Sequence, residues 1–503
     1  MYSEIRQFYS NSNVLITGGT GFLGKVLIQK LVRECEDIGS IYLLIRPKRE
    51  KTIDERCKAI FDDIIFDEMK RKVPNFLTKI VPIEGDTSQI ALGIEKVQRD
   101  RIINQVNIVF HSAACMSMDA KLKDAVATNV RGLGYLIDLC QEMINLKAML
   151  FVSTAYSNCT HPVIEERFYE VPIPAETLIK FMEDVNDSTL DAITQGLVGE
   201  WPNTYCFTKA IAETLLNKRA KCLPAAVFRP TIVMPVYDEP LPGWTPNVFG
   251  PIGAMTATGL GILRVFPCKS NVRCDLVPVD FCINALICSA WDIGRKRSHV
   301  ANGLELQPAI YNYSKGLEGS MTWGEFIKRG IEHDYPLKNV IWYTMLILIS
   351  NIYLYNILWF LLHTIPGSLI DLYLYLSGKN PRMRKIYNKA SKFCEVLKYF
   401  TFNEYKIINR NIANLWNSLN EKDRESFPFD LNQIDYYKAV KDTCLGIKLY
   451  VLKEDLNNVE NEKRRYKKFF IAHTVVKYLL MITTIVIVYG IVRMFCKFLS
   501  VHI

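Results

Sequence analysis

Tyr205 and Lys209 are the pair of residues whose types and spacing best fit chemistry on a carbonyl group. They stand four positions apart in the stretch YCFTK, so a helix would place both side chains on one face. An ammonium near a phenol, whose ordinary pKa is about 10, favours the phenolate and lowers that pKa. Such a tyrosine can donate a proton or a hydrogen bond to the oxyanion that hydride attack on a carbonyl creates. The hydroxyl of Thr154 or of Ser153, in the upstream stretch VSTAY, is the natural second donor.

A Tyr-x-x-x-Lys match alone is weak, because it occurs often by chance on exposed helix faces. Here it follows three other segments: a glycine-rich turn near the start of the chain, HSAA at 111–114 and VSTAY at 152–156. This order makes a chance match remote. We therefore interpret the pair as catalytic and ask which elements would position it.

The glycine-rich turn lies in NVLITGGTGFLGKVLIQKL, residues 13–31, between an apolar run and apolar residues at helical spacing. Three glycines allow a tight turn, close approach of a pyrophosphate to the backbone and close packing of helix on strand. The N-terminus of the following helix offers unpaired N–H groups to the phosphates. The spacing is G-x-x-G-x-x-G rather than the G-x-G-x-x-G of many dehydrogenases. The candidate contacts are Thr17, Gly18, Gly21, Phe22, Leu23 and Gly24.

A second buried strand is predicted in residues 40–49, and it ends in basic residues. Enzymes that use NAD usually place an Asp or Glu there, where it binds the adenosine ribose hydroxyls. Arg46, with Lys48 close by, would instead bind a ribose 2′-phosphate through charge-assisted hydrogen bonds. The sequence therefore predicts NADP rather than NAD.

Further strand-like runs alternate with helical segments in the first half of the chain. They cover residues 79–83, 106–110 and 149–152, and the alternation predicts an α/β fold with a doubly wound parallel sheet. Asp86, just after the first of these runs, would accept a hydrogen bond from the adenine amine. The other candidate cofactor contacts are Ser112, Ala113, Asn129 and Arg229.

Length, charge and cysteine content limit the class of protein. With 503 residues the chain is long enough for two or more domains. The net charge of +9 comes from mostly dispersed basic residues without interleaved aromatics, which argues against nucleic-acid binding. Fourteen cysteines without a C-x-x-C pair indicate reduced thiols facing the cytosol. The seven histidines are too dispersed for a metal site.

Two apolar stretches stand out in the last third of the chain. Residues 469–492 are long enough to cross a bilayer, and the basic cluster before them predicts a cytosolic body. Residues 339–370 contain no Asp, Glu, Lys or Arg, but basic residues flank both ends and Pro366-Gly367 breaks the helical pattern. We therefore expect a transmembrane anchor at 469–492. At 339–370 we expect a helical hairpin that dips into the membrane or is buried in protein.

The order of these motifs resembles the extended short-chain dehydrogenase/reductase superfamily and, more narrowly, the fatty acyl-CoA reductases of animals and plants. The narrower resemblance rests also on FY (8–9), LLIRPK (43–48), FRP (228–230), EPLPGW (239–244) and DLVPVD (275–280). It continues through NPRM (380–383), YFTFNE (399–404), LW (415–416) and GI (446–447), so it covers nearly the whole chain. Leu133 and Met118 depart from common residues of the superfamily or family, and Met118 bears on how an acyl chain is accommodated.

The resemblance implies a Rossmann-type domain that reduces a long-chain acyl-CoA to a primary alcohol. NADPH would be the cofactor. Release of CoA would leave an aldehyde-level intermediate, which would be reduced to the alcohol. Tyr205 would stabilise the oxyanion with Thr154, which register with other extended reductases favours over Ser153. Lys209 would hold the nicotinamide ribose and lower the pKa of Tyr205. No covalent cysteine intermediate is required, so Cys206 is interpreted as a packing residue. The resemblance points to the endoplasmic reticulum first and the peroxisome second.

We expect an NADP-binding reductase domain at 1–300 with its substrate region mostly at 231–300, a connecting segment at 301–338, and a mainly helical domain at 339–465. Two alternatives stay open: a membrane-anchored hydroxysteroid or sterol dehydrogenase of the same superfamily, and a nucleotide-sensing scaffold without catalysis. The segment 380–450 and the basic end of the second strand argue against the dehydrogenase. The intact Tyr/Lys pair argues against the scaffold. The oligomeric state is left open, a homo-oligomer included.

Overall fold

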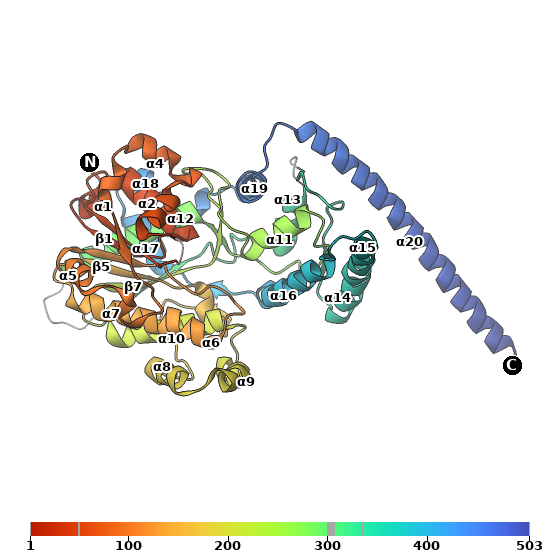
Figure 1. The fold of residues 1–503 in the computed structure, drawn as a ribbon, viewed down its shortest axis with the longest axis horizontal. Coiled ribbons are helices and arrows are strands. Elements are labelled where there is room, and N and C mark those ends of the chain that lie inside the picture. The colour runs from red at the N-terminus through yellow and green to blue at the C-terminus, as the bar shows by residue number, and fades with distance from the viewer. Residues whose placement is uncertain (1, 49–50, 299–306, 333–335, 502–503) are drawn as a thin grey trace.

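A seven-stranded sheet forms the centre of the computed structural model, which describes residues 2–48, 51–298, 307–332 and 336–501 (Figure 1). The strand order is β11-β7-β5-β4-β1-β2-β3, and every neighbouring pair is parallel. The doubly wound parallel sheet expected from the sequence is thereby confirmed. The strands are β1 (Val14–Thr17), β2 (Ile41–Ile45), β3 (Ile80–Glu84), β4 (Ile108–His111), β5 (Ala148–Val152), β7 (Ala225–Pro230) and β11 (Ala309–Tyr313).

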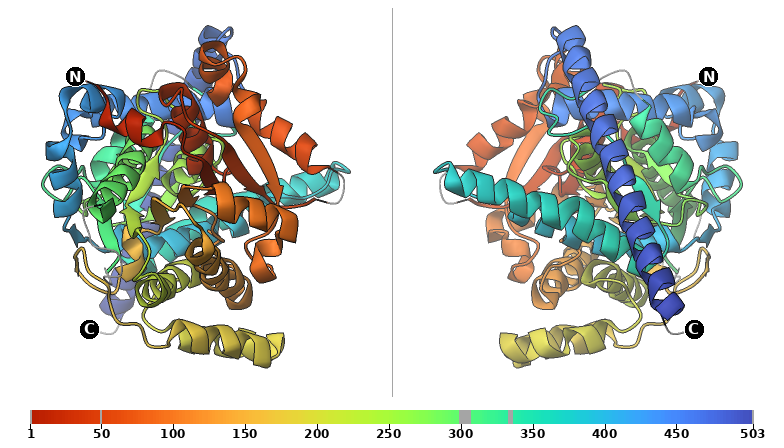
Figure 2. Two further views of the ribbon diagram at one scale, coloured as in Figure 1. Left: turned by 90° about the vertical axis from the view of Figure 1, so that its left-hand side faces the viewer. Right: turned by 90° about the vertical axis from the view of Figure 1, so that its right-hand side faces the viewer.

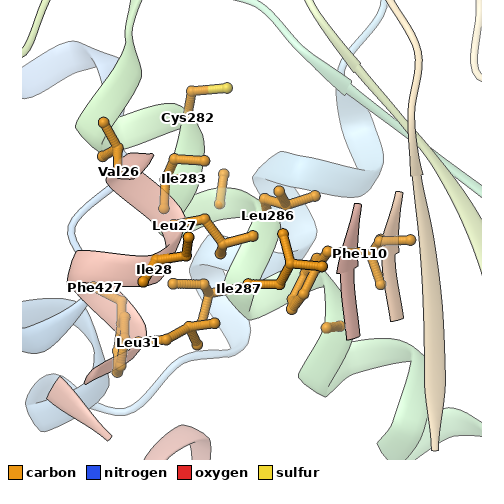
Figure 3. Packing of buried hydrophobic residues seen from close by; sticks show 14 of the residues in the cluster. Val26, Leu27, Ile28, Leu31, Phe110, Cys282, Ile283, Leu286, Ile287 and Phe427 are labelled. Carbon is orange, nitrogen blue, oxygen red and sulfur yellow. The ribbon is translucent and has the colours of Figure 1, made fainter. Parts of the chain in front are cut away.

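Helices cover both faces of the sheet, because successive side chains of a strand point to opposite sides. In β1, Val14 and Ile16 belong to one hydrophobic core, whereas Leu15 belongs to the other. Figure 3 shows the first core, where Leu27 lies close to Ile283 and Leu286. The first face is covered by α2 (Phe22–Glu34) and α12 (Val279–Ser298), and the second by α5 (Lys96–Gln105), α7 (Gly132–Glu142) and α10 (Thr204–Arg219).

The sheet extends past the domain boundary expected at residue 300. β11 forms its edge and pairs with β7 from Ala309↔Ala226 to Tyr313↔Pro230. The side chain of Tyr313 is fully buried in the first core. The structure therefore corrects the division at 300, because a cut there would separate this edge strand from its partner.

The chain beyond residue 405 also returns to the sheet. Phe427 lies in the first core, and the buried Asp423 carboxylate accepts a hydrogen bond from the Ser3 hydroxyl at the start of the first helix. The region expected as a helical domain at 339–465 is therefore not separate from the reductase domain. The helices concerned are α1 (Glu4–Tyr9), α17 (Arg410–Ser418) and α18 (Glu421–Ser426).

A smaller helical region with its own hydrophobic core lies beside the sheet (Figure 1). It contains α11 (Gly250–Gly259), α13 (Trp323–Ile331), α16 (Met383–Phe402), α19 (Tyr436–Gly446) and the strand pairs β8 (Ile232–Met234) with β10 (Leu276–Pro278) and β9 (Val265–Pro267) with β12 (Ile347–Ile349). Residues 157–200 lie outside this region and contain α8 (Ala175–Asp184) and α9 (Asp187–Val198).

The segment expected as a hairpin at 339–370 contains β12 and then one continuous helix. This helix consists of α14 (Ile352–Trp359), a π-helical turn (Phe360–Thr364) and α15 (Ile365–Leu376). Pro366 lacks the N–H that would bond to the Leu362 carbonyl, and Arg264 Nη1 donates to that carbonyl instead, at 2.7 Å. Pro366 therefore does not end the helix, and the hairpin prediction is wrong.

The last helix, α20 (Val459–Val501), extends away from the body (Figure 1). Among the described residues, two helices are long and apolar enough to span a membrane: Ile352–Leu376 and Val459–Met494. The most apolar window of the second has no buried residue, and this helix contains the expected anchor at 469–492. Figure 2 shows both helices on the same side of the molecule.

Candidate active site

The glycine turn after β1 packs closely against the end of β4 and the start of α2. Gly18 has a φ of +77°, and a Cβ here would lie 2.6 Å from the Ala113 nitrogen. A Cβ on Gly24 would lie 2.3 Å from the Gly18 carbonyl oxygen, so glycine lets α2 pack against the turn. Gly21 is the N-cap of α2 and makes no side-chain cap, which fits a pyrophosphate on the first N–H groups of Phe22 and Leu23.

Thr17 joins the end of β1 to the end of β4 beside this turn. Its hydroxyl lies 2.7 Å from Nδ1 of His111, and burial together with the charge of Lys209 lowers the pKa of His111 to about 3. The Thr17 carbonyl accepts the Ser112 hydroxyl at 2.8 Å, and its hydroxyl accepts the Ala113 N–H at 3.3 Å. The structure thus brings the candidates Thr17, Ser112 and Ala113 together next to Gly18.

Arg46 and Asp86 lie together at the ends of β2 and β3. Arg46 Nε is 2.9 Å from Asp86 Oδ2, and the Arg46 side chain is 62 % exposed. The other Asp86 oxygen accepts the N–H and the hydroxyl of Ser88, which fixes the carboxylate. The guanidinium is thereby held at the strand end where a 2′-phosphate is expected, with Lys48 exposed two residues further on.

Lys209 reaches from α10 to the end of β5. Its Nζ donates to the Val152 carbonyl at 2.8 Å and lies 4.5 Å from the centre of the Phe151 ring. Burial lowers the pKa of Lys209 to about 7, against the opposing attraction of Glu213. The start of α10 is fixed by Asn203, whose side chain accepts the Cys206 N–H at 2.8 Å.

Tyr205 stands in the first turn of α10 and lines a large cavity. Burial raises the pKa of Tyr205, and the neighbouring Cys206 thiol adds to the rise. Lys209, whose nitrogen donates to the Val152 carbonyl, is not among the causes of this shift, so the lowering of the Tyr205 pKa by Lys209 stays a prediction. The phenol stays protonated and is suited to donate a proton.

The structure separates the two hydroxyl candidates at the end of β5. Ser153 is buried, and its hydroxyl donates to the Glu213 carboxylate. Thr154 lines the same cavity as Tyr205, and its oxygen accepts the Tyr156 N–H at 3.2 Å. Accepting that bond does not use the Thr154 O–H, so this proton can still be donated to a group in the cavity. This placement favours Thr154 as the second donor.

Glu213, which the sequence analysis missed, organises the buried side of this strand end. Its carboxylate accepts hydrogen bonds from Ser153, Ser157 and Asn158, and from Arg229 Nη2 at 2.6 Å. Arg229 is fully buried and also donates to backbone carbonyls, so its guanidinium does not join the candidates around Gly18. Spacing is the signal that was available, because Glu213 follows Lys209 by four residues on the same helix face.

Asn129 lies in a π-helical turn just before α7, and both ends of its side-chain amide are engaged. Its oxygen accepts the Cys115 N–H at 2.8 Å, and its nitrogen donates to the Thr208 hydroxyl at 2.9 Å. Asn129 therefore connects the loop after HSAA to α10. The contact on α10 is Thr208, which lies between Tyr205 and Lys209 in the sequence.

A cavity of about 930 Å³ begins at Tyr205 and Thr154 and is walled mainly by apolar side chains of the smaller helical region. Its α16 wall runs from Phe400, which lies 5.2 Å from the Tyr156 ring, to Lys389. Eleven residues of helix span about 16 Å. Met118 lines the cavity, as expected if it affects how an acyl chain is accommodated.

The residues that line this cavity differ in part from the substrate region expected at 231–300. Residues 231–233 and α11 contribute to it, but so do α13 and α16, which follow residue 300. The end of the expected region, α12, covers the sheet instead. The arrangement as a whole can hold a dinucleotide at the glycine turn and an extended apolar group beside two hydroxyl donors.

Two family models, both described as male sterility protein, match residues 16–286 and 362–454. The chain is 40 % identical over 473 residues to "Fatty acyl-CoA reductase wat" of Drosophila melanogaster, covering 94 % of this chain and 90 % of the relative. It is 35 % identical to "Fatty acyl-CoA reductase 1" of Homo sapiens, covering 92 % and 89 %. The chain belongs to the fatty acyl-CoA reductase family.

Solved structures agree on the fold of this family member. The reductase domain of a nonribosomal peptide synthetase from Mycobacterium tuberculosis matches with a TM-score of 0.58 at 17 % identity, covering 90 % of this chain and 96 % of that one. The terminal R domain of the myxalamid pathway matches with a TM-score of 0.54 at 17 % identity, covering 87 % and 90 %. The family model that matches residues 16–286 and the glycine turn at the N-terminus of α2 support a nicotinamide cofactor.

Proposed function

We propose that this protein reduces a long-chain fatty acyl-CoA to a primary alcohol with NADPH and releases CoA. The observation that carries the proposal is the cavity, which starts at the two hydroxyl donors and continues between apolar side chains for a length that suits an acyl chain. Membership of the reductase family and the N-terminus of α2, which has no side-chain cap at Gly21, support the same reaction.

The residues around the glycine turn fit a dinucleotide. Gly18, Gly21 and Gly24 would hold the pyrophosphate at the N-terminus of α2, and Arg46 would bind the 2′-phosphate. Lys209 would hold the nicotinamide ribose, with its position set by the Val152 carbonyl. When bound, the cofactor supplies hydride to the substrate carbonyl carbon.

Tyr205 and Thr154 would act on the substrate oxygen in both reductions. Hydride addition to the thioester makes an oxyanion that accepts hydrogen bonds from the two hydroxyls. When the carbonyl re-forms, the carbon–sulfur bond breaks, and CoA leaves as thiolate to give the aldehyde. A second hydride addition gives an alkoxide, which takes the Tyr205 proton and becomes the alcohol. The raised pKa of Tyr205 keeps that proton in place until the alkoxide forms.

Lipid profiling of yeast that expresses the full chain tests the reaction directly. We expect new primary fatty alcohols, and we expect membranes from these cells to consume NADPH with palmitoyl-CoA but not with a hydroxysteroid. Turnover of the hydroxysteroid alone would favour the sterol dehydrogenase alternative. Cofactor binding without turnover of either substrate would favour a nucleotide-sensing scaffold.

Arg46→Ala is expected to raise the KM for NADPH about 10- to 100-fold and to leave the KM for NADH nearly unchanged. The variant removes a charge-assisted contact that only the 2′-phosphate can make, and such contacts are worth about 1.5–3 kcal/mol. Initial rates with each cofactor measure the effect, with NADH as the internal control. If both KM values rise equally, Arg46 acts only through its salt bridge with Asp86.

We further propose that α20 anchors the protein in the endoplasmic reticulum, or secondly the peroxisome, with the body in the cytosol. Truncation after Lys468 is expected to abolish attachment that resists alkaline carbonate, because the exposed apolar part of α20 is lost. Extraction of membranes from cells that express each form measures this. Carbonate resistance of the truncated protein would show that another segment is integral. Protection of an N-terminal tag from protease in intact vesicles would contradict the cytosolic orientation.

A further inference from the structure

One face of the α14–α15 helix presents large apolar side chains that the body of the protein does not cover. Leu369, Leu372, Tyr373 and Leu376 are 54–75 % exposed, and Ile357 and Phe360 in the first half are comparably exposed. Soluble proteins rarely leave so large a contiguous apolar surface open, so such a patch indicates a partner or a membrane.

The opposite face of the same helix is fixed to the body along most of its length. Contacts recur every four residues: Tyr355 is buried, Trp359 packs against the core of the smaller helical region, and Gly367 lies against the Tyr387 ring. At the far end the Asp371 carboxylate accepts the N–H groups of residues 382, 383 and 384 at 2.8–2.9 Å.

The π-helical turn at 360–364 keeps the packed residues, which are spaced four apart, on the side of the helix that faces the body. At 100° per residue, positions four apart drift by about 40° in a regular α-helix, and a wider turn offsets that drift. The turn is held by the body, since Arg264 bonds to His363 through its N–H and to the Leu362 carbonyl through its guanidinium. The helix therefore cannot leave the body to cross a bilayer by itself.

A run of positive charge follows α15 in the sequence and contacts the helix through Asp371 and Gly367. Residues 377–394, which link α15 to α16 and form most of α16, contain six Lys or Arg residues and no Asp or Glu. Lys389 and Lys392 of this run also line the cavity, so the charged border reaches the outer part of the cavity wall. An apolar strip with a basic border complements the acyl region and anionic headgroups of a lipid leaflet.

We propose that α14–α15 lies flat in the cytosolic leaflet of the membrane, with its apolar face in the acyl boundary and residues 377–392 at anionic headgroups. The proposal rests on the membrane attachment proposed for α20. Its second support is position, because α20 and α14–α15 share one side of the molecule (Figure 2). In addition, the ring of Tyr343, shortly before β12, stacks on that of His473 in α20. The protein would then contact the bilayer through a spanning helix and an in-plane helix.

Photo-crosslinking in sealed microsomes tests this with the full chain. The photoreactive amino acid benzoylphenylalanine replaces Tyr373 on α15, Tyr478 on α20 or Tyr2 on the far side of the molecule (Figure 1), all well exposed tyrosines. We expect phospholipid adducts from positions 373 and 478 and none from position 2, with unchanged melting temperatures showing that the variants fold.

The outcomes separate this proposal from the proposed anchor. Adducts at 478 but not at 373 would overturn the in-plane helix and leave the anchor standing. No adduct at either position would overturn both, and a crosslinked protein dimer at 373 would show that a second copy covers the face.

Labelling from the cytosolic side distinguishes a flat helix from a spanning one. In Lys379→Cys the added thiol is expected to react with an impermeant maleimide in sealed microsomes. Labelling of the unsubstituted protein measures the background from its native cysteines. Reaction only after permeabilisation would place residue 379 in the lumen and overturn the in-plane arrangement.

Discussion

Tyr205→Phe is expected to lower the rate of fatty alcohol formation by about two to four orders of magnitude and to leave NADPH binding intact. The substitution removes the proton that the alkoxide takes and keeps the ring at the start of α10. The kcat for palmitoyl-CoA and the cofactor Kd, measured on the same preparation, test both halves of the prediction.

Cys206→Ala is the matched control, because this residue adjoins Tyr205 and lines the same cavity. We expect its activity to stay within about tenfold of the parent protein, since the mechanism needs no thiol nucleophile. A loss in Cys206→Ala as large as that in Tyr205→Phe would point to a covalent thioester. Normal turnover by Tyr205→Phe would exclude the phenol as the proton donor.

Glu213→Ala is expected to lower the free energy of unfolding by about 3–5 kcal/mol. The variant leaves the Arg229 guanidinium buried without its carboxylate, and an unpaired buried charge is costly. It also removes the acceptor of the Ser153 and Ser157 hydroxyls. Chemical denaturation of the detergent-solubilised full chain measures the change.

Glu176→Ala provides the control for a lost salt bridge at the surface. Glu176 pairs with Lys218 at 3.0 Å while both side chains are well exposed, and such pairs contribute about 0–1 kcal/mol. The double variant Glu213→Leu with Arg229→Met should recover part of the loss, because an apolar pair removes the buried charge. Equal destabilisation by Glu213→Ala and Glu176→Ala would show that the buried network is not needed for stability.

Local patterns predicted the elements whose signals lie within a few residues. The apolar run before Gly18 and the three glycines determine a strand, a turn and a helix start, and the structure has all three. The Tyr205/Lys209 spacing likewise placed both residues on one helix. The sequence alone could not distinguish Thr154 from Ser153, because they are adjacent hydroxyl residues. Their positions in the structure favour Thr154.

The features that the sequence did not predict depend on contacts between distant segments. Pro366 reads as a helix breaker, and only the guanidinium of Arg264, 102 positions earlier, satisfies the freed carbonyl. The raised pKa of Tyr205 depends on burial of its phenol by other elements, which the residues around it in the sequence do not reveal. Arg229 looked available for a cofactor because its partner Glu213 lies on another element.

The cap that Asp423 provides for α1 has a consequence for how the protein is made. The hydrogen bond joins residues 420 positions apart, so the first helix of the chain acquires its partner only after most of the polypeptide has left the ribosome. Phe427 and Phe429 reach the first core equally late, whereas the edge strand β11 is synthesised more than 100 residues earlier. Nascent chains that end before residue 423 therefore lack part of the first core, and closure of the reductase core is a late event in translation.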